Sequence, residues 1–326
     1  MKDAILQILL EHKGDFVSGQ EISSQLMVSK TAIWKCINSL KADGYLIDSS
    51  ARESHCLREC PDLLTPLEIK LGLGTKVFGQ QLQCYTTIDS TNEAAKRAAL
   101  AGAEEGMVIV AERQELGKGR LGRHWFSPAR LGLWFSLILR PPIHPFQASQ
   151  LTFVSAVAVC QALRNLTGLP LLIKWPNDLL WRDKKVCGIL TELSVEREDI
   201  NYLVVGVGIN VNQQEDDFPL EIKKTACSLA IATGRVWQRA AILRQILEEY
   251  EQQYMQYLSK GFGQTLEHWR TLNTTLSKEV TVSTKEETFT GIAEDINEQG
   301  CLLVRKKNGE LETLLAGDVT IRRNFW

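Results

Sequence analysis

The sequence lacks an excess of charge of either sign, so it is not a generally basic protein. Its 326 residues include 37 Lys and Arg against 39 Asp and Glu, which gives a formal net charge of -2 at pH 7. Any contact with a nucleic acid must therefore come from a local patch of positive charge, because the field of the whole molecule does not favour polyanions. The composition neither supports nor excludes DNA binding.

A secretory signal and a membrane-spanning run are also missing. The first ten residues contain Asp3 and Gln7 and no small-residue cleavage site. The most apolar stretch, residues 151–163, is interrupted by three polar residues and is too short to cross a bilayer. We therefore expect a cytoplasmic protein with no membrane partner.

The eight cysteines include no CxxC pair, and most lie in apolar surroundings, as reduced packing residues do. His55, Cys56 and Cys60 form the one cluster that could suggest a metal site. A tetrahedral site needs a fourth ligand, and none is evident nearby. We predict no metal site built by the protein alone.

The first sixty residues have the pattern of a winged helix. Ser18 and Glu21 form a capping box that predicts a helix to about Met27, and Ser29 caps a second helix immediately afterwards. The second helix has an apolar face and a terminal glycine, formed by Ile33, Ile37, Leu40 and Gly44. Two short helices with a tight turn indicate a helix-turn-helix, and two short apolar segments around the polar turn 49–54 predict a wing.

The second helix is the candidate DNA contact. Between residues 29 and 42 it carries three lysines and no acid. The side chains predicted to face DNA are Ser29, Lys30, Thr31, Trp34, Lys35 and Asn38. The alternative is a solvated helical pair that contacts proteins, because the first sixty residues hold seven Lys and Arg against eight acids. The segregation of charge favours DNA, and the prolines at 61 and 66 place a domain boundary after residue 62.

The centre of the chain alternates strands and helices. Apolar periodicity predicts strands at 107–112, 131–139, 171–175, 186–193 and 202–209, and helices at 91–100, 148–166 and 240–258. This order indicates a mixed sheet with helices, of the size of one catalytic domain that spans residues 63–274.

The segment Gly117–Trp125 places three glycines and three strong cations between two predicted strands. Glycines allow backbone N–H groups to approach an anion closely, and cations offset its charge, so the segment resembles an anion-binding loop. The spacing of a Walker loop is absent. A solvated basic hairpin is the alternative.

Two further segments, Lys174–Asp178 and Lys185–Leu190, hold charged residues in fixed geometry beside a strand. Together with Asp89–Asn92, Gln114–Pro128 and Gly206–Asn212, they make the chain resemble the biotin protein ligases, specifically those with an N-terminal operator-binding domain. The Gly206-x-Gly208 pair alone does not indicate a dinucleotide fold, because the third glycine is missing.

The resemblance implies an α+β protein whose catalytic domain is similar to class II synthetases. It implies an enzyme that makes biotinyl-5'-AMP from biotin and ATP with Mg²⁺, and then biotinylates a lysine of a biotin carboxyl carrier protein. It also implies a biotin-responsive repressor that binds operator DNA as a homodimer when it holds the adenylate.

Residue roles follow from the same resemblance, position by position. The residues implied to contact biotin are Ser90, Thr91, Gln114, Lys118, Arg120, Lys185, Gly188, Ile189 and Leu190. Those implied to contact the adenylate are Trp125, Asn177, Asn210 and Asn212, with the loop 212–224 ordering over the adenosine. Lys185, Arg120 and Asp178 are the implied catalytic residues.

Physical chemistry agrees with these roles. A carboxylate that attacks a phosphate must overcome repulsion between anions, so fixed cations such as Lys185, Arg120 and Lys118 are needed. A carboxylate such as Asp178 can orient the acceptor amine or take its proton, although a turn cap after Pro176 is the alternative. The family usually has arginine where this chain has Lys118, and Leu121 replaces a residue that is often basic. Lysine keeps the positive charge but lacks the planar fork that makes bidentate contact with a phosphate.

Residues 275–326 contain short strands with polar turns, including the hairpin signal Asn308-Gly309. They predict an SH3-like barrel, which serves either as structural support or in acceptor docking or nucleotide binding. Three rival functions are a ligand-sensing repressor without catalysis, a lipoate ligase, and a ligase that no longer represses. Intact Lys185, Arg120 and Asp178 argue against the first, and the joint glycine-loop and Lys174–Asp178 pattern favours biotin over lipoate.

Overall fold

The computed structural model describes residues 1–50, 53–284, 287–315 and 318–321. The chain divides into two compact units, Met1–Leu71 and Gly72–Trp326. The first unit extends past residue 62 because it includes helix α4 (Pro66–Lys70), where the Tyr45 hydroxyl donates to Glu68 Oε1 over 2.6 Å. Leu63 and Leu67 pack against the core of the same unit.

The first unit is a helix-turn-helix with a small three-stranded sheet, in the order β1-β3-β2. Its elements are α1 (Lys2–Glu11), β1 (Val17–Ser18), α2 (Gly19–Leu26), α3 (Lys30–Ala42), β2 (Leu46–Ser49) and β3 (Ser54–Glu59). Ser18 Oγ accepts from the Glu21 N–H over 3.1 Å, and Ser29 Oγ accepts from the Ala32 N–H over 3.3 Å. Both predicted N-caps are therefore present. Residues 51 and 52 of the predicted wing turn lie outside the described part of the chain.

The second unit is built on a seven-stranded mixed sheet in the order β4-β5-β6-β10-β9-β8-β7. The strands are β4 (Leu82–Tyr85), β5 (Val108–Ala111), β6 (Gly132–Leu139), β7 (Leu172–Lys174), β8 (Asp178–Trp181), β9 (Lys184–Glu196) and β10 (Asp199–Asn210). Only β4 and β5 pair in parallel, and the other described pairs are antiparallel. The predicted mixed sheet is confirmed.

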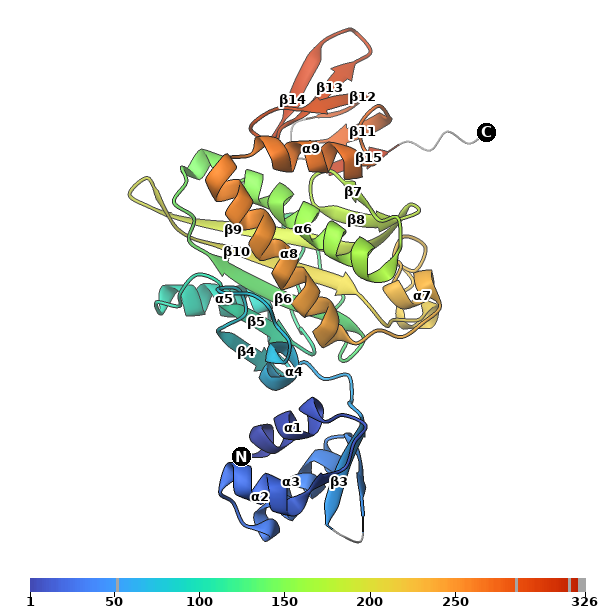
Figure 1. Cartoon of the computed structure of the whole chain (residues 1–326). Coiled ribbons are helices and arrows are strands. Elements are labelled where there is room, and N and C mark those ends of the chain that lie inside the picture. The colour runs from blue at the N-terminus through green and yellow to red at the C-terminus, as the bar shows by residue number, and fades with distance from the viewer. Residues whose placement is uncertain (51–52, 285–286, 316–317, 322–326) are drawn as a thin grey trace. The chain divides into compact units, whose positions relative to one another are not determined.

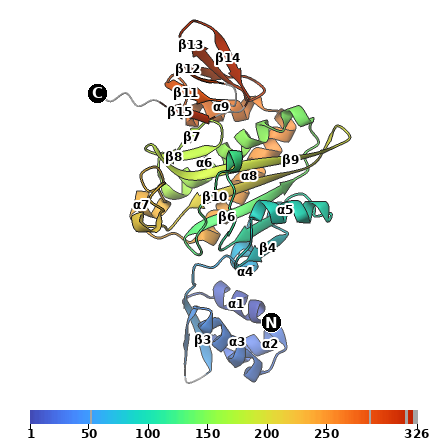
Figure 2. The ribbon, with the colours of Figure 1, turned by 180° about the vertical axis from the view of Figure 1, so that it is seen from behind.

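Helices cover both faces of this sheet (Figures 1 and 2). The helices of the second unit are α5 (Thr91–Leu100), α6 (Gln150–Thr167), α7 (Leu229–Thr233), α8 (Arg239–Lys260) and α9 (Gly263–Leu272). Helices α6 and α8 pack against each other on one face, whereas α5 lies on the other face against β6 and β10. The helix that bears Ser90 at its N-cap therefore lies on the face opposite the main helical layer.

Residues Pro145–Thr167 are long and apolar enough to cross a membrane by length and composition, with a mean hydropathy of 1.3. However, 72% of this apolar window is buried inside the protein, where α6 packs against α8 and α9. A helix buried in a protein core can have the same length and apolar composition as a membrane-spanning helix, because both are surrounded by apolar groups. Here it serves as a core helix.

The C-terminal part is a five-stranded antiparallel sheet in the order β14-β13-β12-β11-β15. Its strands are β11 (Glu279–Ser283), β12 (Thr288–Ile296), β13 (Leu302–Lys306), β14 (Leu311–Leu314) and β15 (Asp318–Ile321). Gln150 Nε2 of α6 donates to Glu298 O over 2.8 Å, which holds the turn before β13 against α6. The predicted short strands with polar turns are confirmed, while closure into a barrel stays a prediction.

Candidate active site

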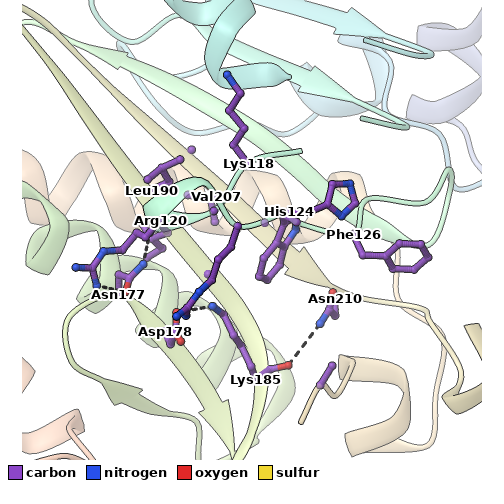
Figure 3. A pocket seen from close by; sticks show the side chains of 18 of the residues that line it. Lys118, Arg120, His124, Phe126, Asn177, Asp178, Lys185, Leu190, Val207 and Asn210 are labelled. Carbon is purple, nitrogen blue, oxygen red and sulfur yellow. Dashed lines mark hydrogen bonds and ion pairs between the residues drawn. The ribbon is translucent and has the colours of Figure 1, made fainter. Parts of the chain in front are cut away.

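A cavity of about 260 Å³ opens on the face of the sheet that carries α5. Its walls come from the start of α5, the glycine loop 117–126, the turn 174–178, strands β9 and β10, and the loop 222–226. Figure 3 shows side chains from these separate segments converging on one space. Sequence-distant motifs therefore meet in a single site.

Almost all of the residues predicted to bind ligand or to act in catalysis line this cavity. They are Ser90, Thr91, Gln114, Lys118, Arg120, Trp125, Asn177, Asp178, Lys185, Gly188, Ile189, Leu190 and Asn210. Asn212 lies outside the lining. Its Oδ1 accepts from the Trp237 N–H and its Nδ2 donates to Trp237 O, each over 2.9 Å. This geometry makes Asn212 an anchor of the chain after β10, and it does not support a direct contact with ligand.

The cationic end of the cavity is formed around Lys185. Its Nζ lies 2.6 Å from Asp178 Oδ1 and 5.1 Å from the centre of the Trp125 ring. Asp178 is the first residue of β8, and its carboxylate contacts Lys185, so it is placed as a member of the site. Figure 3 shows the two side chains pointing toward each other.

Arg120 reaches the same end from the glycine loop. Its Nη1 donates to Asn177 Oδ1 over 3.2 Å. Asn177 is itself held by β9, because its Nδ2 donates to Ile189 O over 2.5 Å and its O accepts from the Ile189 N–H over 3.0 Å. The guanidinium of Arg120 is therefore held by Asn177, a buried side chain whose own hydrogen bonds fix its position.

Lys118 takes a different direction from the other two predicted cations. Figure 3 shows it pointing away from Arg120 and Lys185. Its Nζ lies 2.7 Å from Glu93 Oε1 on α5, and Lys96 contacts the same carboxylate at 3.2 Å. The hydrogen bond from Lys118 is the main reason that the pKa of Glu93 is lowered from its usual value. In this conformation two of the three predicted cations, Arg120 and Lys185, face the cationic end.

The other end of the cavity is uncharged and rich in oxygen. Gln114 Oε1 accepts from the Thr91 N–H over 2.8 Å and lies 3.0 Å from Thr91 Oγ1, while its Nε2 donates to Ser127 Oγ over 2.9 Å. Ser90 and Thr91 are buried as residues but border the cavity. We call Ser90, Thr91 and Gln114 the polar end of the cavity.

Glycines on β9 and β10 leave room for side chains that cross the sheet face. A Cβ at Gly206 would overlap Asn92 Oδ1, and a Cβ at Gly208 would overlap Trp125 Nε1. At Gly188, which pairs with Gly208, a Cβ would stand 3.0 Å from the Trp125 ring. The Gly206-x-Gly208 motif therefore has a steric role that its spacing alone did not reveal.

Sequence analysis missed several residues of the site. Asn92 and Lys174 line the cavity and belong to motifs that were recognised, so their positions could have drawn attention. Val319 also lines it, although it comes from the C-terminal sheet and no local pattern marks it. Among the described residues, no group of three or more His, Cys, Asp or Glu is arranged to hold a metal ion.

The candidate DNA interface lies on α3 of the first unit. The six residues predicted to face DNA are all exposed, and Trp34 keeps 61% of its surface accessible. The opposite face of α3 is buried through Ile33, Cys36, Ile37 and Leu40. Lys30 Nζ lies 2.6 Å from Oε2 of Glu53, the residue before β3, so one cation of this face already has an acidic neighbour.

Family models match three parts of the chain. The Biotin/lipoate A/B protein ligase family matches residues 84–210, an HTH domain matches 2–53, and the Biotin protein ligase C terminal domain matches 275–322. The fold and the site thus define the class: a protein ligase of the biotin and lipoate type joined to a helix-turn-helix domain.

The relatives narrow this class. The bifunctional ligase/repressor BirA of Bacillus spizizenii is 37% identical over 98% of this chain and 98% of its own, and that of Escherichia coli is 29% identical over 97% and 96%. The structure of biotin protein ligase from Aquifex aeolicus in complex with biotin and ATP is similar with a TM-score of 0.64 and 33% identity, covering 75% of this chain and all of that one. The chain belongs to the family of bifunctional ligase/repressor proteins, and the resemblance seen in the sequence is confirmed.

Proposed function

We propose that this protein forms biotinyl-5'-AMP from biotin and ATP, transfers biotin to a specific lysine of a biotin carboxyl carrier protein, and represses transcription in response to biotin. The observation that carries this proposal is a cavity with a cationic end at Lys185 and Arg120 and a polar end at Ser90, Thr91 and Gln114. Biotin has the matching shape: a carboxylate at one end and a polar ring at the other.

In the first reaction the biotin carboxylate oxygen bonds to the α-phosphorus of ATP, and the bond to pyrophosphate breaks. Both reactants are anions, so their approach requires cations that are already in place. Lys185 and Arg120 supply this charge from the cationic end, while Trp125 and Asn177 border the space available to the adenylate.

We infer that Mg²⁺ is required and that it arrives with the phosphates of ATP. Among the described residues that line the cavity, Asp178 is the one carboxylate, and Lys185 is paired with it. A magnesium ion is commonly held by substrate phosphates and few protein carboxylates, so this lining fits a nucleotide-borne cation. The ion supplies further charge neutralisation when bound.

In the second reaction the neutral amine of the carrier lysine attacks the carbonyl of the mixed anhydride, and AMP leaves. The amine must lose a proton as the amide forms. Asp178 borders the cavity beside Lys185 and is positioned to orient the amine or to accept that proton.

For repression, α3 presents its exposed face to operator DNA, and a homodimer reads two half-sites related by symmetry. We propose that biotinyl-adenylate promotes this dimer by ordering the glycine loop and the loop 212–224. Carrier protein would discharge the adenylate and relieve repression. The eight free cysteines fit a reducing compartment, and we place the protein in the cytoplasm.

The ligase proposal is tested by incubating the protein with ATP, Mg²⁺ and either biotin or lipoate, followed by mass spectrometry. Biotinyl-adenylate is the expected product. Formation of lipoyl-adenylate alone would identify lipoate, not biotin, as the substrate. The absence of any adenylate would favour a ligand-sensing repressor without catalysis.

The coupling of the two functions is tested by sedimentation and by binding to the cognate operator, with and without biotin and ATP. We expect tighter self-association and tighter DNA binding once adenylate has formed. Equal values in both states would remove the coupling and leave the ligase assignment intact.

A further inference from the structure

A chain of buried hydrogen bonds leads away from the polar end of the cavity. Ser136 Oγ lies 2.7 Å from Thr91 Oγ1 and 2.6 Å from Asn92 Oδ1. Asn92 Nδ2 lies 2.8 Å from Glu192 Oε2, and Lys96 Nζ lies 2.5 Å from Glu192 Oε1. Ser136 is fully buried and is not part of the cavity wall, so it acts only through its neighbours.

The partners determine the orientation of both amides in this chain. Ser127 Oγ donates to Trp125 O, so it must accept from Gln114 Nε2, and Gln114 Oε1 then faces Thr91. Glu192 is paired with Lys96 and accepts hydrogen bonds, so the Asn92 NH₂ faces Glu192 and Asn92 Oδ1 faces Ser136. Each amide therefore presents an oxygen to a hydroxyl.

Counting hydrogens then shows a shortage of donors between the two amides. Three oxygen–oxygen contacts lie there: Gln114 Oε1 with Thr91 Oγ1, Thr91 Oγ1 with Ser136 Oγ, and Ser136 Oγ with Asn92 Oδ1. The two hydroxyls supply two hydrogens, and neither amide oxygen supplies one. Whichever way the hydroxyls rotate, one of the three contacts has no hydrogen. A ligand that donates a hydrogen to Thr91 Oγ1 relieves the shortage, because Ser136 is then free to donate to Asn92 Oδ1.

The direction of the cavity identifies which part of a ligand meets these acceptors. Along β10, Gly206 faces Asn92 and Gly208 faces Trp125, while on β9 they pair with Leu190 and Gly188. The cavity thus runs along the two strands from the polar end toward Lys185. A ligand whose carboxylate lies near Lys185 must place its ring at Thr91 and Gln114.

We propose that Glu192 is a positioning residue that selects for a ring bearing N–H groups. Acting through Asn92 and Ser136, it keeps these three contacts one hydrogen short, so a ureido N–H donated to Thr91 or Gln114 is favoured. The dithiolane ring of lipoate offers no N–H and leaves the shortage unrelieved. This inference rests on the proposed ligase function and assigns the choice of ring within it to a residue outside the cavity wall.

Replacing Glu192 by glutamine tests the idea because it permits the chain to reverse. The new amide can donate to Asn92 Oδ1, after which Asn92 donates to Ser136, Ser136 to Thr91, and Thr91 to Gln114. Each of the three contacts then has a hydrogen, at the cost of the long hydrogen bond of 3.4 Å from Asn92 Nδ2 to Leu190 O, and the shortage of donors is gone. Glu192 is partly exposed and glutamine has nearly its shape, so the fold should persist.

The Glu192→Gln protein should raise the KM for biotin about 10- to 100-fold, the cost of a mismatched hydrogen bond in a desolvated site. Its KM for ATP, its kcat at saturating biotin and its melting temperature should change little. Biotin methylated on both ureido nitrogens lacks the N–H groups, and its already weak binding should not weaken further. The preference for biotin over lipoate should therefore fall by a similar factor.

Glu196→Gln is the matched control, because Glu196 lies on the same strand, is exposed, and accepts a long hydrogen bond of 3.4 Å from Asn201 Nδ2, outside the chain of hydrogen bonds through Asn92. Ser136→Ala interrupts the chain, so Glu192→Gln added to that variant should cause no further loss of biotin preference. Equal losses for biotin and the methylated analogue, or an additive double variant, would overturn the proposal. If the unaltered protein makes no biotinyl-adenylate, the proposed function fails instead, and the two failures are distinguishable.

Discussion

Replacing Lys185 by glutamine removes the cation that lies closest to Asp178 in the cavity and keeps a side chain of similar volume. In the unaltered protein Lys185 Nζ is 2.6 Å from Asp178 Oδ1 and borders the space where a carboxylate and a phosphate must meet. The substitution leaves that carboxylate without its cation, so it also adds a repulsive charge. We expect slower adenylate formation with the fold intact.

The size of the loss follows from Coulomb's law. A unit charge about 4 Å from a phosphoryl oxygen contributes roughly 4 kcal/mol at an effective dielectric constant of about 20. The Lys185 side chain is 34% exposed, so water screens part of this interaction. A decrease in kcat/KM of about 10²- to 10³-fold is the result that we expect.

The assay is release of pyrophosphate at saturating ATP, with Lys184→Gln as control. Lys184 precedes Lys185 on β9 and is absent from the cavity wall. Adding Asp178→Asn to the Lys185→Gln protein removes the unpaired carboxylate and should restore adenylate formation about tenfold, although transfer to carrier protein stays slow. A folded Lys185→Gln protein with activity within threefold of the original would refute the electrostatic argument.

Two truncations and two substitutions test separate parts of the structure. A protein that begins at Gly72 should remain a monodisperse ligase without operator binding, whereas one that begins at residue 63 should scatter more light because it exposes apolar residues that belong to the first unit. Gly208→Ala should displace Trp125 and raise the KM for ATP about tenfold or more, with biotin binding less affected in calorimetry. Glu53→Gln should free Lys30 and tighten DNA binding by about 2- to 5-fold at low salt, and fluorescence anisotropy at high salt should show that difference shrinking.

Local signals in the sequence were sufficient to predict helices whose N-terminus is capped by a side chain. The helices that start at Ser18 and Ser29 were predicted because a capping side chain acts within three residues. Helix α1 went unpredicted, and it has no side-chain cap. Its place in the fold comes from burial of Ile5 and Leu9, which is a tertiary effect.

The register of strand pairs, and contacts between segments far apart in the chain, could not be predicted from local patterns. Strand β8 has four residues, and its pairing with β9 shifts register between Leu179 and Leu180. This irregular register decides that Asp178 and Lys185 point toward each other, and no local pattern encodes it. The resemblance to a family supplied both residues, whereas the network through Ser136 became visible only when β6, α5 and β9 were assembled.

The two ends of the cavity differ in how readily they can rearrange, and this difference suits a two-step reaction. Thr91, Asn92 and Ser136 are each at most 4% exposed, and a buried hydrogen-bond network is costly to break. Lys185 and Lys118 are 34% and 48% exposed at their side chains, so water screens their ion pairs, and exchanging Asp178 or Glu93 for a phosphate costs less than breaking the buried network. The protein can therefore hold the biotin ring in one place through both reactions, while Lys185 and Lys118 exchange their carboxylate partners for the phosphates of the substrate.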